Sequence, residues 1–95
     1  ASQNEHEEEL LPIKQLQDEL KELQLAGQYI QREYDNITAA GGELSDEQYQ
    51  VQLTNLGEQR DKLEEIERRY QQLADQHKGD AFGIEMLEAL DGVQS

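Results

Sequence analysis

Apolar residues recur at alternating intervals of three and four over the first half of the chain. They stand at Ile13, Leu16, Leu20, Leu23, Ile30, Tyr34 and Ile37, and Gly27 occupies the one remaining position of the series. In a helix such positions form one narrow stripe, and a stripe that persists over several heptads is typical of a coiled coil. The spacing therefore predicts a long helix over residues 12–40, packed along a partner helix.

A second long helix is predicted beyond a glycine pair. Gly41–Gly42 ends the first helix, and Ser45 followed by Gln48 has the spacing of a capping box, which begins a new helix. A second apolar series follows at Tyr49, Leu53, Leu56, Leu63, Ile66, Tyr70 and Leu73. These signals indicate a turn over 41–44 and a second helix over 45–78.

Helices joined by so short a turn lie antiparallel. Folding the chain about the turn places apolar residues opposite one another: Ile37 and Tyr49, Tyr34 and Leu53, Ile30 and Leu56, Leu23 and Leu63, Leu20 and Ile66, Leu16 and Tyr70, and Ile13 and Leu73. The coincidence of these layers favours an all-α fold, an antiparallel coiled-coil helical hairpin over residues 10–79. The acidic residues 1–9 are predicted to be a disordered lead-in.

The apolar series is interrupted at the same height in both helices. Gly27 breaks the first series, and the second slips near Gly57 and Arg60. A glycine here either makes room for the Arg60 stem or for a backbone crossing, or provides a hinge or a notch in which another chain docks. We favour the packing explanation and leave the hinge as the alternative.

Residues 80–95 are predicted to form a short amphipathic helix and tail that begins at Asp80. This helix either folds back to give a three-helix bundle or stays available to a second chain, with two hairpins associating into a four-helix bundle. We favour self-association because so short a chain often completes its core by oligomerising.

Apolar residues outside the hairpin seam indicate where a partner would bind, because a two-helix hairpin buries only one stripe. The candidate partner-binding residues are Leu25, Gly27 and Tyr29 on the first helix and Phe82, Met86, Leu87 and Leu90 on the last. We therefore expect a protein partner, most simply a second copy of the chain in a homodimer or homo-oligomer.

The chain carries 22 acidic and 8 basic residues, a net charge of −14. This acidity disfavours direct binding to nucleic acid and to anionic membranes, which both require an excess of Lys and Arg. There is no Cys, and no apolar run approaches the roughly 20 residues of a transmembrane helix. We expect an intracellular, cytoplasmic protein.

Catalytic, cofactor and metal sites are not predicted. His6 and His77 are the only histidines, and we assign neither an acidic partner at the helical spacing of a zinc or di-metal site. Gly41–Gly42 lacks the Lys-Ser/Thr that follows a phosphate-binding glycine loop. We therefore expect a protein that is not an enzyme.

These observations favour a non-enzymatic coiled-coil module for protein–protein interaction or oligomerisation, an adaptor or scaffold within a larger assembly. The alternative is an acidic inhibitor or regulator that mimics nucleic acid and occupies a basic binding site or channel.

The tip sequence supplies one version of this alternative. Residues Gly42–Glu47 resemble the acidic tip of the N-terminal hairpin of Gre-type transcript-cleavage factors, which reaches into the secondary channel of RNA polymerase. The resemblance implies a polymerase-channel-type hairpin. This chain differs from that family in lacking the Asn of the tip and in placing its Tyr one position earlier, at Tyr49.

Overall fold

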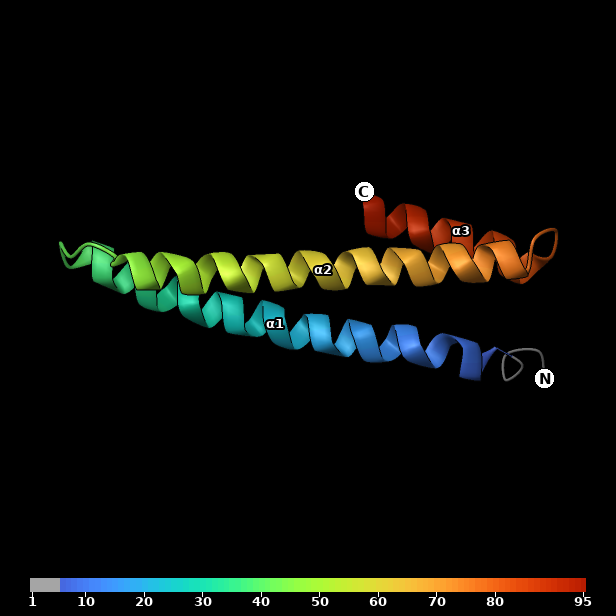
Figure 1. The fold of residues 1–95 in the computed structure, drawn as a ribbon, viewed down its shortest axis with the longest axis horizontal. Coiled ribbons are helices and arrows are strands. Elements are labelled where there is room, and N and C mark those ends of the chain that lie inside the picture. The colour runs from blue at the N-terminus through green and yellow to red at the C-terminus, as the bar shows by residue number, and fades with distance from the viewer. Residues whose placement is uncertain (1–5) are drawn as a thin grey trace.

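Two long antiparallel helices lie side by side, and a short third helix turns back along the second (Figure 1). The computed structural model describes residues 6–95, which form α1 (Glu7–Ala39), α2 (Asp46–Gln76) and α3 (Ala81–Gln94). The molecule is a rod with principal extents of 58 × 21 × 18 Å. The predicted all-α hairpin with a short C-terminal helix is confirmed, and α3 packs on α2 of its own chain.

The helix ends are set by local chemistry that the sequence displays. Gly41 has φ +87°, and the N–H groups of Gly41 and Gly42 donate to Thr38 O (3.0 Å) and Ile37 O (2.9 Å). This is a Schellman motif, in which glycine adopts the left-handed conformation at little cost. It ends α1 and reverses the chain.

The start of α2 is fixed by the predicted capping box. Ser45 Oγ accepts from the N–H of Gln48 (3.2 Å), and Gln48 Oε1 accepts from the N–H of Ser45 (2.8 Å). At the other end of the rod, α1 begins earlier than expected. Residues 7–9 form its first turn, where their carboxylates oppose the positive end of the helix dipole. The remainder of the expected lead-in, residues 1–5, lies outside the described residues.

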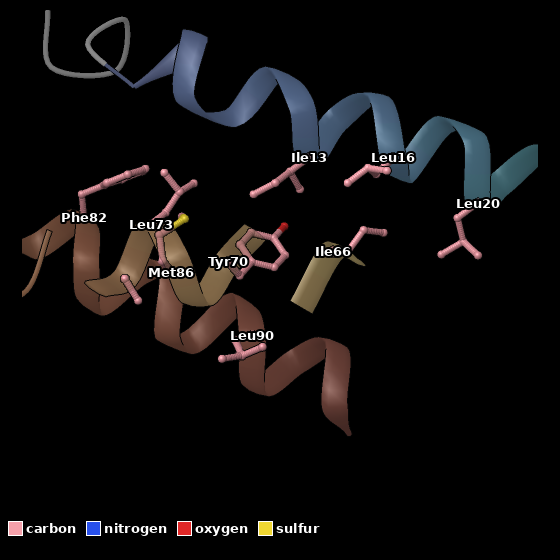
Figure 2. Close-up of a cluster of buried hydrophobic side chains, with 10 residues drawn as sticks. Ile13, Leu16, Leu20, Ile66, Tyr70, Leu73, Phe82, Met86 and Leu90 are labelled. Atoms are coloured by element: carbon pink, nitrogen blue, oxygen red, sulfur yellow. The ribbon is translucent and has the colours of Figure 1, made fainter. Parts of the chain in front are cut away.

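The hydrophobic core lies at the end of the rod away from the turn, where all three helices meet (Figure 2). It contains Ile13, Leu16 and Leu20 of α1, Ile66, Tyr70, Leu73 and Ala74 of α2, and Phe82, Met86 and Leu90 of α3. The apolar pairs predicted for this half of the hairpin therefore share one core. We term this half of the rod, together with α3, the base, and we term the half nearer the turn the arm.

In the arm, α1 keeps its predicted face, with Tyr34 buried and Ile30 partly buried, but their predicted partners on α2 do not cover them. Leu53 and Leu56 are largely exposed, and α2 instead turns polar side chains towards α1. Gln52 Nε2 donates to Gln31 Oε1 (2.7 Å), and Asn55 Nδ2 donates to the backbone oxygen of Leu23 (3.0 Å). The helices are antiparallel as expected, but in the arm α2 contacts α1 through a different face from the one predicted.

Two heptad series run next to each other along α2, and this explains why the wrong face of α2 was expected to meet α1 in the arm. The series that faces α1 contains Gln52, Asn55, Gln59, Lys62, Ile66, Arg69 and Leu73; it is polar in the arm, and its apolar members are buried in the base. The neighbouring series contains Tyr49, Leu53, Leu56, Arg60, Leu63, Glu67, Tyr70 and Ala74. Its first four apolar members, Tyr49, Leu53, Leu56 and Leu63, are exposed and form what we term the open stripe; Tyr70 and Ala74 are buried in the base.

Candidate functional site

The residues expected to bind a partner fall into two groups in the structure. Phe82, Met86 and Leu90 are buried in the base, where they pack against α2 of the same chain. Packing in the chain's own core, rather than the expected partner surface, therefore accounts for these three. Leu87 is exposed, because it lies on the side of α3 that faces away from the core.

Leu25, Gly27 and Tyr29 do not form a single patch. Leu25 and Tyr29 are exposed and lie four residues apart on one face of α1. Gly27 lies about 200° around the helix from each of them, since consecutive residues are rotated by about 100°. It faces α2, so the candidate surface on α1 is reduced to the two exposed side chains.

Gly27 is explained by a polar contact rather than by the stem of Arg60. A Cβ added at Gly27 would lie 2.6 Å from Asn55 Oδ1 and 2.9 Å from Gln59 Nε2. Asn55 is only 8% exposed, and both polar atoms of its side chain form hydrogen bonds. Its Nδ2 donates to the backbone oxygen of Leu23, and its Oδ1 accepts from Gln59 Nε2 (2.7 Å). Glycine therefore allows a buried, hydrogen-bonded amide to reach the backbone of α1.

A band without charges surrounds this contact. Residues 23–31 of α1 and residues 48–57 of α2 contain no charged residue, in a chain that is 32% charged. The two segments are joined by the bonds from Asn55 and Gln52. Of the ten large apolar side chains that are exposed within residues 6–95, six lie in this band: Leu25, Tyr29, Tyr49, Val51, Leu53 and Leu56. The band therefore holds most of the large apolar side chains that are exposed in the part of the chain that the structure describes.

A groove runs next to the open stripe. Its volume is about 490 Å³, and its lining consists of five glutamines together with Gly27, Ile30, Asn55 and Leu56. Leu56 belongs to both the groove and the open stripe, so the two form one continuous surface on one side of the arm. Leu23 lines a different hollow with Glu19 and Lys62, which places the charged side of the hairpin elsewhere.

A second cluster lies in the base, where the ends of the three helices meet. His6 is the N-cap residue of α1, His77 is the C-cap residue of α2, and Glu9 lies in the first turn of α1. His6 Nδ1 is 2.8 Å from Glu9 Oε2, and His77 Nε2 is 2.9 Å from Glu9 Oε1. One carboxylate thus bridges two imidazoles that are far apart in the sequence.

Phe82 holds both imidazole rings in place. The ring of His6 stacks on Phe82, with centroids 3.7 Å apart and planes inclined by 4°. The ring of His77 meets Phe82 edge-on, at 4.8 Å and 87°. Since Phe82 is itself buried, the orientations of both histidines are tied to the packing of α3.

These contacts shift the pKa values of Glu9, His77 and Asp80. Hydrogen bonds from His6 and His77 lower the pKa of Glu9 below 4.5, and the bond to Glu9 raises the pKa of His77 above 6.5. Asp80 is the N-cap of α3: its Oδ1 accepts from the N–H of Gly83 (3.1 Å), which lowers its pKa. Asp80 Oδ2 lies 3.6 Å from His77 Nδ1.

The expectation that neither histidine has an acidic partner at a helical spacing is wrong. Glu9 follows His6 by three residues and Asp80 follows His77 by three, and both pairs are in contact. These spacings were visible in the sequence. The meeting of the two pairs was not, because it depends on the hairpin and on the return of α3.

Comparisons with known proteins do not place this chain in a family. The chain matches no protein-family model, no curated protein and no solved structure. Within residues 6–95, none of the helices combines the length and the apolar character needed to cross a membrane.

Proposed function

We propose that this protein is a non-enzymatic helical-hairpin module that self-associates, and that two copies pair through the open stripe. The observation that carries the proposal is that three of the four members of this stripe, Tyr49, Leu53 and Leu56, lie within the band that has no charges. Tyr49, Leu53, Leu56 and Leu63 extend along about 21 Å of α2, given a rise of 1.5 Å per residue. A scaffold or adaptor built from this chain would use the stripe to join two hairpins.

The open stripe has the spacing of a helix-packing surface. Its residues belong to the heptad series whose last members, Tyr70 and Ala74, are buried in the base. A Cβ added at Gly83 of α3 would lie 3.4 Å from Ala74 O, so α3 packs closely at this end of α2. In the arm, the same series has no helix of residues 6–95 over it and remains exposed.

A second copy of the chain is the partner that fits this surface best. Each copy carries a net charge of −14, so two copies repel wherever their charged faces approach. The band without charges is where that repulsion is smallest, and it is also where the apolar side chains gather. A two-fold axis near Leu56 would place Tyr49 of each copy near Leu63 of the other and bring four helices together.

The experiment measures the mass of the full chain in solution by sedimentation equilibrium over a range of concentrations. The variant Leu56→Glu should weaken dimerisation by at least about tenfold, because it places a charge in an apolar contact. The matched control is Leu25→Glu. Leu25 is 57% exposed and Leu56 is 54% exposed, and both lie in the band without charges, but only Leu56 belongs to the open stripe.

Ionic strength separates this proposal from the alternative of an acidic inhibitor. Dimerisation through the stripe should strengthen with salt, because salt screens the repulsion between the two acidic copies. Binding of an acidic mimic to a basic site should weaken instead. A chain that remains monomeric at high concentration and high salt, or a dimer equally weakened by both glutamate variants, would refute pairing through the open stripe.

A further inference from the structure

We propose that His6, Glu9 and His77 form a binding site for one divalent transition-metal ion with the ligand preferences of zinc. The three residues come from the two ends of the hairpin and meet at the base of the rod. They play no part in the proposed association, which uses the arm.

The set of donor atoms fits this class of metal. Two imidazole nitrogens and one carboxylate oxygen form a common protein ligand set for zinc, with a fourth position left to water. Imidazole also suits copper, nickel and cobalt, whereas magnesium and calcium prefer sites made of oxygen atoms. The many other carboxylates of this acidic chain therefore do not offer an equivalent site, since His6 and His77 are its only histidines.

The geometry brings the donor atoms close to where a metal would hold them. One ligand atom from each of the three residues lies within 4.8 Å of the other two. Zinc binds such atoms at about 2.0–2.2 Å, which keeps the ligand atoms of a tetrahedral site about 3–3.5 Å apart. Glu9 already contacts both rings at 2.8 and 2.9 Å, so small rotations of the side chains suffice to close around an ion.

The surroundings of the ligands support binding as well. Phe82 fixes the planes of both imidazoles, which reduces the freedom that an ion would have to remove. Asp80 lies 3.6 Å from the other nitrogen of His77, the position in which a carboxylate commonly orients a metal-bound histidine. The side chains of His6, Glu9 and His77 are between one fifth and about one third exposed, so an ion can reach them from solvent.

An ion at this position would link the start of α1 to the junction between α2 and α3. Because the ligands lie at opposite ends of the hairpin sequence, the unfolded chain does not hold them together. Binding would therefore favour the folded state and raise the melting temperature as the metal concentration rises.

The test is a titration of the metal-free full chain with Zn²⁺, followed by calorimetry and by thermal unfolding. We expect one ion per chain, a higher melting temperature, and no competition from excess Mg²⁺. With Co²⁺, the chain should develop the visible absorption of a four-coordinate site. His77→Gln and Glu9→Gln should each weaken binding by more than about 100-fold, since they remove a ligand, and Asp80→Asn by about 10-fold.

Two controls keep the outcome interpretable. Glu8→Gln removes the same charge from the same turn of α1 as Glu9→Gln, but Glu8 contributes no ligand atom to the cluster and its variant should bind zinc as the original chain does. Asp80→Asn keeps a good N-cap for α3. If zinc does not bind, or if Glu8→Gln and Glu9→Gln weaken binding equally in variants that circular dichroism shows to be folded, the site does not exist.

Discussion

Gly27 of α1 and Asn55 of α2 fit together so closely that a single added carbon on the glycine would lie 2.6 Å from the Asn55 side-chain oxygen. Asn55 is the one polar residue within residues 6–95 that is buried to the degree of the core residues. A buried amide within an otherwise periodic seam fixes how two helices align, because a shift would leave its polar atoms without partners. This contact therefore sets the alignment of the arm, where apolar packing is sparse.

Gly27→Ala should destabilise the protein although alanine is the better helix former by about 1 kcal/mol. The added Cβ displaces Asn55, whose buried amide then loses its partners at a cost of about 1–3 kcal/mol. Urea unfolding measures the change. Gly57→Ala is the control: a Cβ there meets no atom of residues 6–95 within 4 Å, so this variant should gain about 1 kcal/mol. Equal gains for the two variants would contradict the proposed role of the contact.

Gly83→Ala should be more harmful than Gly27→Ala. A Cβ at Gly83 would lie 2.1 Å from the backbone oxygen of His77, and a backbone atom cannot rotate away as a side chain can. Since α3 would have to move, we expect a loss of about 1–3 kcal/mol and weaker packing of the base. Gly92→Ala, in the same helix, meets no atom of residues 6–95 within 4 Å and should not destabilise. Thermal unfolding of both variants tests the difference.

The two halves of the hairpin should respond differently to truncation of a side chain. Ile66 in the base is 2% exposed, and Ile66→Ala should cost about 2–5 kcal/mol because it leaves a cavity. Leu53→Ala in the arm removes a largely exposed side chain and should change the free energy of unfolding of the monomer by less than about 0.5 kcal/mol. Denaturant unfolding at a protein concentration low enough to keep the chain monomeric makes the comparison. Similar losses would show that the arm is packed as tightly as the base.

The contact between Glu9 and His77 should make stability depend on pH. The pKa of His77 is raised above 6.5, so its contribution is complete below that pH and is lost as the pH rises through the raised value. The pKa of Glu9 is lowered below 4.5, so its contribution is present above that pH and is lost as the pH falls through the lowered value. Between the two values, Glu9 is ionised, His77 is protonated, and the pair stabilises the fold most.

The measurement compares the urea midpoints of the original chain and of His77→Gln, in the presence of a chelator so that no metal contributes. The difference between them should be larger at a pH below 6.5, where His77 is protonated, than at alkaline pH, where it has lost its proton. Lys78→Gln is a suitable control, because it removes a positive charge from the next residue and leaves the contact with Glu9 in place. A difference that does not change with pH would show that the pair contributes nothing through its charge.

The architecture was predictable because local signals and periodicity agreed. The glycine pair, the capping box at Ser45 and Gln48, and the apolar repeat each pointed to a hairpin. The face of α2 that meets α1 was not predictable from the apolar repeat. In the arm that face is occupied by Gln52, Asn55 and Gln59, and the leucines lie on the neighbouring heptad series. Matching apolar residues across the turn therefore selected the wrong series there.

The cluster of His6, Glu9 and His77 in the base could not be predicted from the sequence for a different reason. His6 and His77 are brought together by the length of the hairpin and by the position of Phe82, neither of which can be read from a spacing. The burial of Phe82 likewise depended on whether α3 turned back, a choice between two arrangements that the sequence left open.

The contrast between an apolar base and a polar seam in the arm has a mechanical consequence. Water can replace the polar contacts of the arm, such as the hydrogen bond from Gln52 to Gln31, one at a time, whereas separating the base exposes its whole core at once. A force that pulls α1 and α2 apart within the arm would therefore break separate contacts in turn, and would meet its greatest resistance at Leu20 and Ile66, where the core of the base begins.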